Sequence, residues 1–181
     1  FTDYVVCCLD SSGVQQNCIS LSSCVDTGSA SPDLTNLSTI QCGGRQYYSG
    51  NEVFPAVYAV ELGTDIGLVE VTHSAYNIPD KFTIEWSGST VFNSGYVGST
   101  YSQNNLNLEL DDRGVSRETI TNLTPVYGGG PGDGFGTFSK TTPFPNVAIV
   151  RVYGPLPGTA WDMEVSCPGA KIKRKRKFQT Y

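Results

Sequence analysis

The chain has 181 residues, of which 39% are apolar and only 16% are charged, with 20 glycines and 10 tyrosines. This length suits one domain, with or without a small accessory segment, and the apolar fraction is sufficient for a hydrophobic core. No apolar run reaches the roughly 18 residues that a membrane-spanning helix requires, so no membrane span is expected.

The charge is unevenly distributed along the sequence. Six of the twelve basic residues lie between Lys171 and Lys177, and the net charge of −5 becomes −11 when these six are set aside. Because an acidic body repels phosphate, nucleic acid is not expected as its partner. The basic tail, residues 170–181, is interpreted either as a tether to nucleic acid or an anionic surface, or as a solvated terminus.

The first 50 residues are a Cys-rich segment, set apart by serine, asparagine and glycine. The six cysteines of the chain are Cys7, Cys8, Cys18, Cys24, Cys42 and Cys167. Their even number and clustering predict disulfides, mostly within residues 1–50, and hence an oxidising environment. A bond from Cys167 to an early cysteine would tie the two ends of the chain together. Free thiols and zinc are the alternatives, and zinc is disfavoured because no Cys-x-x-Cys pair occurs.

Residues 51–169 are predicted to form the main domain, a series of short strands separated by Gly, Pro and Asn turns. In chain order the expected strands are 57–62, 67–73, 81–86, 90–92, 135–139, 148–153 and 161–167. This pattern predicts an antiparallel β-sandwich, either jelly-roll or immunoglobulin-like. Its core is expected to contain Phe82, Ile84, Val150 and Trp161, and Trp86 is also interpreted as a core residue.

One segment of the main domain, Tyr101–Ile120, is ambiguous. Leu106, Leu108 and Leu110 alternate as they would in a strand. However, the flanks are polar, Ser102 could cap a helix, and Gly114 would end it. We favour a short helix or helical turn here.

Catalytic chemistry is not expected. His73 is the only histidine, its alternating context suggests a strand residue at the surface of a sheet, and no Gly-x-Ser-x-Gly motif occurs. A glycosidase with carboxylates from distant strands is the one enzymatic alternative. The glycine-rich run 128–136 lacks the Lys-Ser/Thr of a phosphate-binding loop, so we interpret it as a flexible turn.

Three acidic turns suggest a cation site. Asp65, Asp80 and Asp133 each lie in a turn that contains glycine or proline, where backbone carbonyls can point at an ion. Calcium accepts six to eight oxygen ligands in loose geometry, so a structural Ca²⁺ is predicted, with Asp111 and Asp112 as reserve ligands. The alternative is that these carboxylates only cap their own turns.

Short phrases occur in a fixed order through the main domain. They are Phe54-Pro55, Leu62-Gly63-Thr64-Asp65-Ile66-Gly67, Pro79-Asp80-Lys81-Phe82, Ser94-Gly95-Tyr96-Val97-Gly98, Gly134-Phe135-Gly136-Thr137-Phe138-Ser139-Lys140, Pro155-Leu156-Pro157-Gly158-Thr159-Ala160-Trp161 and Ser166-Cys167-Pro168. Together they resemble a β-sandwich module that recurs in structural proteins of tailed bacteriophages, including crAss-like phages, and in bacterial surface proteins. The resemblance covers residues 54–168.

This resemblance implies a non-catalytic virion component, such as a head or tail appendage or fibre, on the virion surface or otherwise extracellular. Its expected partners are other virion subunits or further copies of itself. It could also mediate attachment to a host-surface glycan, because Tyr47, Tyr48, Tyr96 and Tyr101 could stack on sugar rings. A secreted bacterial carbohydrate-binding or adhesin module is the alternative function.

Overall fold

The computed structural model describes residues 5–6, 19–20, 37–123 and 130–171. The chain divides into two compact units, Phe1–Thr35 and Asn36–Tyr181. In the first unit, β1 (Val5–Val6) and β2 (Ile19–Ser20) form an antiparallel pair. Four cysteines lie outside the described residues, and their predicted disulfides remain a prediction: Cys7, Cys8, Cys18 and Cys24.

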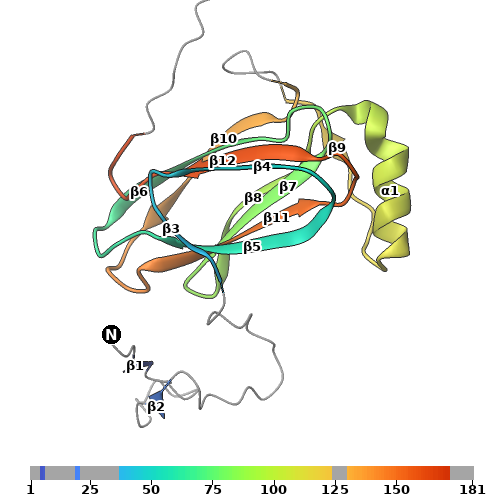
Figure 1. Ribbon diagram of the computed structural model, residues 1–181. Helices are drawn as coiled ribbons and strands as arrows, with labels where there is room; N and C mark the ends of the chain where they lie inside the picture. Colours follow the sequence, from blue (N-terminus) through green and yellow to red (C-terminus); the bar gives the residue numbers. More distant parts are fainter. Residues whose placement is uncertain (1–4, 7–18, 21–36, 124–129, 172–181) are drawn as a thin grey trace, which may run out of the picture. The chain divides into compact units, whose positions relative to one another are not determined.

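The second unit is a sandwich of two β-sheets, which confirms the predicted all-β fold (Figure 1). The four-stranded sheet has the order β10 (Asp133–Lys140), β6 (Gly67–Ser74), β12 (Ala160–Val165), β4 (Arg45–Ser49). The six-stranded sheet has the order β3 (Thr39–Gln41), β5 (Val53–Glu61), β11 (Val147–Gly154), β7 (Asp80–Trp86), β8 (Ser89–Val97), β9 (Ile120–Thr121). Neighbouring strands are antiparallel except β3 with β5 and β8 with β9.

The sandwich begins before residue 51, where the sequence suggested a domain boundary. β3 pairs with β5 in one sheet, and β4 pairs with β12 in the other. The chain crosses between the sheets at Cys42 and Gly43, and the Gly43 N–H donates to the Val165 carbonyl at 2.7 Å. Composition could not locate this boundary, because the serine- and glycine-rich character continues through β3 and β4, and β4 pairs with a strand more than 100 residues away.

The main core lies between the two sheets and contains the four residues predicted for it. Phe82, Ile84 and Val150 are fully buried, and Trp161 is 4% exposed. They meet because alternate residues of a strand point to the same face. Trp86 is buried as well, and its indole N–H donates to the Pro145 carbonyl at 2.8 Å.

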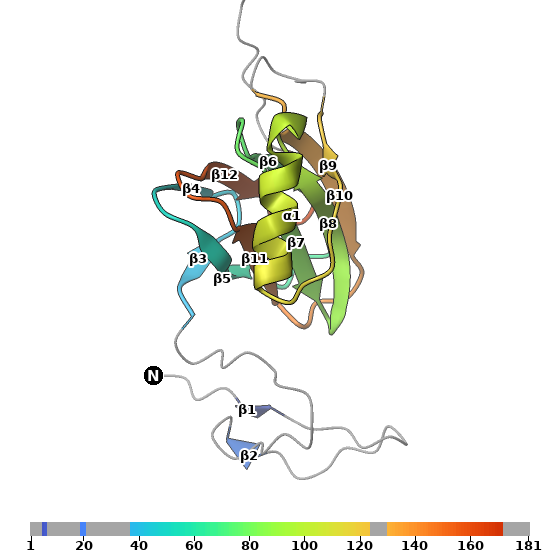
Figure 2. The ribbon, with the colours of Figure 1, turned by 90° about the vertical axis from the view of Figure 1, so that its right-hand side faces the viewer.

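A second, smaller core forms beneath α1 (Gln103–Asp112), which follows the 3₁₀ turn η3 (Thr100–Ser102) and lies at one end of the sandwich (Figure 2). Leu106 and Leu110, four positions apart, are fully buried, whereas Leu108 is 61% exposed. The helix ends at Asp112, and Gly114, the residue predicted to stop it, follows with a φ of +68°. No helix in the described ranges is long and apolar enough to cross a bilayer.

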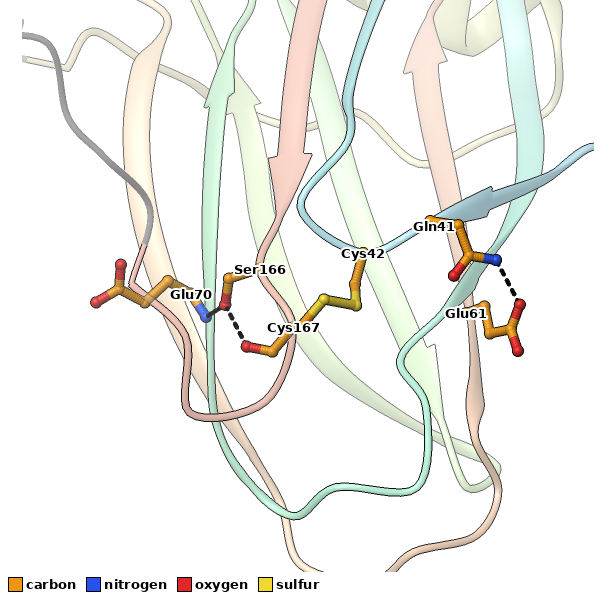
Figure 3. Close-up of a disulfide and its surroundings, with 6 residues drawn as sticks. All are labelled: Gln41, Cys42, Glu61, Glu70, Ser166 and Cys167. Atoms are coloured by element: carbon orange, nitrogen blue, oxygen red, sulfur yellow. Dashed lines mark hydrogen bonds between the residues drawn. A yellow bond between two sulfur atoms is a disulfide. The ribbon is translucent and has the colours of Figure 1, made fainter.

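A disulfide between Cys42 and Cys167 joins the two sheets (Figure 3). Cys42 directly follows β3 of the six-stranded sheet, and Cys167 follows β12 of the four-stranded sheet. Nearby, the Ser166 hydroxyl accepts the Glu70 N–H and donates to the Cys167 carbonyl. The bond closes the chain over a separation of 125 residues, so it is a link between Cys167 and an early cysteine, and the presence of a disulfide is confirmed.

We expect Phe82→Ala to lower the free energy of unfolding by about 3–5 kcal/mol, because it removes a fully buried ring and leaves a cavity. Chemical denaturation would measure this loss. Leu108→Ala is the control, because its side chain is mostly exposed on α1, and it should change stability by less than about 1 kcal/mol. Equal effects of the two substitutions would contradict the core assignment.

Replacing both bridging cysteines, in Cys42→Ala/Cys167→Ala, should cost about 4–5 kcal/mol, because the unfolded chain regains the freedom of a 125-residue loop. Denaturation of the double variant and of the oxidised parent, at equal pH, tests this. Peptide mapping without reduction should recover the cross-linked pair from the parent. Recovery of either cysteine as a free thiol would contradict the assignment.

Candidate functional site

The four-stranded sheet presents one side to the core and the other to solvent, and we call the solvent side the outer face. Its side chains alternate with the buried ones along each strand. The outer face consists of Arg45, Tyr47 and Ser49 of β4; Ala160, Asp162 and Glu164 of β12; Leu68, Glu70, Thr72 and Ser74 of β6; and Asp133, Phe135, Thr137 and Ser139 of β10.

Strand pairing arranges these side chains in rows across the sheet. One row contains Tyr47, Asp162, Ser74 and Asp133, one residue from each strand. The next row is Arg45, Glu164, Thr72 and Phe135. Aromatic, acidic, basic and hydroxyl groups therefore gather in two adjacent rows that span the whole sheet.

Asp162 is the polar centre of the outer face. Its carboxylate accepts hydrogen bonds from Arg45, through Nη2 at 2.7 Å and Nε at 3.2 Å, and from the Tyr76 hydroxyl at 2.7 Å. The Asp162 side chain is only 7% exposed. Its hydrogen bond raises the pKa of Arg45, and burial together with the same carboxylate raises the pKa of Tyr76 to about 12. Both partners are thus held in fixed protonation states at neutral pH.

Tyr76 reaches the outer face from the loop after β6, in a backbone conformation that is unusual for a residue with a side chain. Its φ is +49°, in the left-handed region. Its N–H donates to the Ser74 hydroxyl at 3.2 Å, and its carbonyl accepts the Gly132 N–H at 3.0 Å. A Cβ on Gly130 would lie 2.8 Å from the Tyr76 carbonyl oxygen, so glycine permits this close approach.

The described end of the glycine-rich run therefore supports Tyr76 rather than forming a phosphate loop. Residues 124–129 lie outside the described ranges, but from residue 130 the chain packs against the Tyr76 loop and continues directly into β10. Tyr76 could not be identified from the sequence, because nothing local predicts that its loop folds back over the sheet. The one signal in the sequence is that Tyr76 precedes a predicted turn, Asn77-Ile78-Pro79. Only the structure shows that this turn lies against the glycine-rich segment.

The four tyrosines predicted to bind sugar differ in position and in exposure. Tyr47 is 66% exposed on the outer face. Tyr48 points to the opposite side, where its ring stacks on Trp161 at 5.8 Å. Tyr96 is 1% exposed beneath α1, so its prediction as a ligand-stacking residue is wrong. Tyr101 is 99% exposed, but it lies in η3, outside the outer face.

The three carboxylates predicted to bind calcium do not form one site. Asp133 is paired with Ser74 at the end of β6, whereas Asp65 precedes Gly67 at its start. The eight residues of β6 separate these positions by about 23 Å. Asp80 is fully buried and accepts a hydrogen bond from the Thr159 hydroxyl at 2.6 Å. Within the described ranges, no group of three potential metal-ligating side chains occurs.

At one of these turns, the one that contains Asp65, the ammonium group of a lysine contacts the backbone. Lys140 is 1% exposed, and its ammonium donates to the carbonyls of Asp65 at 2.9 Å, Thr142 at 2.7 Å and Pro143 at 2.9 Å. The Asp65 carbonyl, in the turn between Gly63 and Gly67, therefore faces a positive charge. The charge belongs to the protein itself and pins the β5–β6 loop to the β10–β11 loop.

His73 lies in the core rather than at the sheet surface. It is 5% exposed, and its ring is 4.7 Å from the Phe82 ring. Burial lowers the pKa of His73 from its ordinary value of 6.5 to about 4, so the imidazole is neutral at pH 7. Gly134 leaves room for it, because a Cβ at that position would overlap the imidazole. A side chain in this position cannot reach a ligand on the outer face.

Comparison with known proteins identifies no family. No protein-family model matches the chain, and no curated protein matches it. Among solved structures, the chain is similar to the pre-peptidase C-terminal domain of a collagenase from Bacillus anthracis, with a TM-score of 0.40 and 8% identity. The similarity covers 76% of this chain and 100% of that domain. A likeness this distant identifies neither the family nor the function of the chain.

Asp80 should make stability depend on pH. Burial raises its pKa from 3.8 to about 8, so the folded state keeps a proton that the unfolded state releases. The free energy of unfolding therefore falls as pH rises between these values. His73 opposes this trend between pH 4 and 6.5, so the effect of Asp80 is measured most directly from pH 6.5 to 8.

We expect stability to fall by about 1.4 kcal/mol per pH unit at the lower end of that window, and by about half as much per unit near pH 8. Asp80→Asn should abolish the slope, because it no longer titrates. Asp65→Asn, at an exposed carboxylate, should retain it. Urea denaturation at pH 6.5, 7.25 and 8 would measure all three proteins. A slope that persists in Asp80→Asn would assign the proton to another group.

Proposed function

We propose that this protein is a non-catalytic attachment module that binds a surface glycan through the outer face of its four-stranded sheet. The observation that carries the proposal is the pair of exposed tyrosines beside a fixed ion pair. Tyr47 and Tyr76 are 66% and 37% exposed, and both adjoin Asp162 and Arg45. Aromatic rings present apolar surface to the faces of sugars, and charged hydrogen-bonding groups meet the hydroxyls around their edges.

The rigidity of the outer face supports binding without a large ordering cost. Arg45 and Tyr76 both hold Asp162, and the Tyr76 backbone is fixed by Ser74 and Gly132. Side chains that are already in place lose little conformational entropy when a ligand arrives. The same bonds argue for binding rather than hydrolysis, because the Asp162 oxygens are engaged by protein donors instead of being directed at a substrate bond.

The biological setting of the proposal is a phage particle. Its support is the ordered series of phrases across residues 54–168, which resembles the sandwich module of phage appendages. In this setting the module would lie on the virion surface and assemble with itself or with other virion subunits. The alternative is a secreted bacterial carbohydrate-binding or adhesin module, which would use the same outer face. Mass spectrometry of purified particles and of culture medium separates the two settings.

Tyr47→Ala should weaken glycan binding at least about tenfold, because the substitution removes an exposed stacking ring worth roughly 1.4 kcal/mol or more. A glycan array would identify ligands, and isothermal titration would give the affinities. Tyr101→Ala is the matched control, because it removes an even more exposed tyrosine outside the outer face. Loss of binding in Tyr101→Ala but not in Tyr47→Ala would overturn the assignment of this surface.

A further inference from the structure

We infer that the outer face binds an extended, uncharged glycan chain that lies across the strands, rather than a single terminal sugar. This inference rests on the proposed function and names the class of ligand. It follows from three features of the two adjacent rows: the spacing of their aromatic side chains, the hydrogen-bonding groups between them, and the balance of charge.

The aromatic side chains mark the two edges of the sheet. Tyr47 lies on the edge strand β4, and Phe135, which is 39% exposed, lies on the opposite edge strand β10. Their rows are adjacent, and three strand-to-strand steps separate them, or about 14 Å. This distance is longer than one sugar ring. A ligand that contacts both aromatic rings must therefore contain several linked sugars.

Hydrogen-bonding side chains fill the interval between the two rings. Glu164 comes from β12 and Thr72 from β6, the two central strands of the sheet, and both are partly exposed. Asp162 and Ser74, in the other row, are buried and already bonded to Arg45 and to the Tyr76 N–H. A chain laid perpendicular to the strands would meet an aromatic ring first, then carboxylate and hydroxyl groups, and then a second aromatic ring. A chain laid along one strand would meet only one of the two rings.

The charge of the rows opposes an anionic ligand. Arg45 is the single basic side chain in them, and it is already paired with Asp162 at 2.7 Å. Asp133 and Glu164 add two further carboxylates in the same rows. Polymers that carry carboxylates or phosphates would be repelled at close range, and the repulsion would weaken as salt is added. Neutral chains carry no such cost.

Isothermal titration with length series of defined oligosaccharides tests the inference. The probes are neutral cello-, manno- and chito-oligosaccharides of one to six units, with oligogalacturonides of the same lengths as the acidic match. For a neutral series that binds, affinity should rise at least about tenfold from the disaccharide to the hexasaccharide. Oligogalacturonides should bind at least about tenfold more weakly at low salt.

Two variants test which aromatic side chains contact the two ends of the bound glycan. Phe135→Ala should remove most of the gain from longer chains and leave disaccharide binding unchanged, whereas Tyr47→Ala should weaken every length. Leu108→Ala, an exposed apolar side chain on α1, should change neither and serves as the control. Thermal melts would verify that each variant is folded.

The outcomes distinguish this inference from the proposed function. Binding that depends on Tyr47 but not on chain length or Phe135 would overturn the extended-chain inference and leave the proposed function standing. Preferred binding of oligogalacturonides would overturn the charge argument in the same way. Absence of Tyr47-dependent binding to every probe and to the array would overturn the proposed function, and this inference with it.

Discussion

The packing of Trp161 between the two sheets is the interaction on which the rest of the structure depends. Its ring stacks with Tyr58 of β5 at 6.3 Å and meets Phe82 of β7 edge-on at 6.3 Å, so one residue of the four-stranded sheet contacts two strands of the other. Since neighbours along a strand point to opposite faces, burying Trp161 places Asp162 on the outer face. The core and the candidate site are therefore fixed by the same register.

Two different interactions hold the same end of the sandwich, where β5 ends and β6 begins. At one crossover the Cys42–Cys167 disulfide joins the sheets covalently. At the β5–β6 and β10–β11 loops, the ammonium of Lys140 donates to three carbonyls and links the two loops. A buried lysine is tolerated because every proton it carries has a partner.

Much of the fold could be predicted from the sequence. The alternation in β6, β7, β11 and β12 reflects one buried and one exposed face, and this pattern is a local property of each strand. The helix over residues 103–112 was correctly favoured over a strand, because its polar flanks and Gly114 outweighed three alternating leucines. Disulfide bonding was also predicted, although its expected place was mostly within residues 1–50.

The candidate site was only partly predictable. The sequence by itself determined the strand pattern of the main domain and the acidic character of the body. Only the tertiary structure decided that α1 covers Tyr96, that β6 separates Asp65 from Asp133, and that Tyr76 leans over the sheet onto Asp162. The physical reason is that the alternation of apolar and polar residues indicates only which side of its own strand each residue occupies. Which strands are neighbours, and which loops fold over them, depends on pairings between segments far apart in the chain.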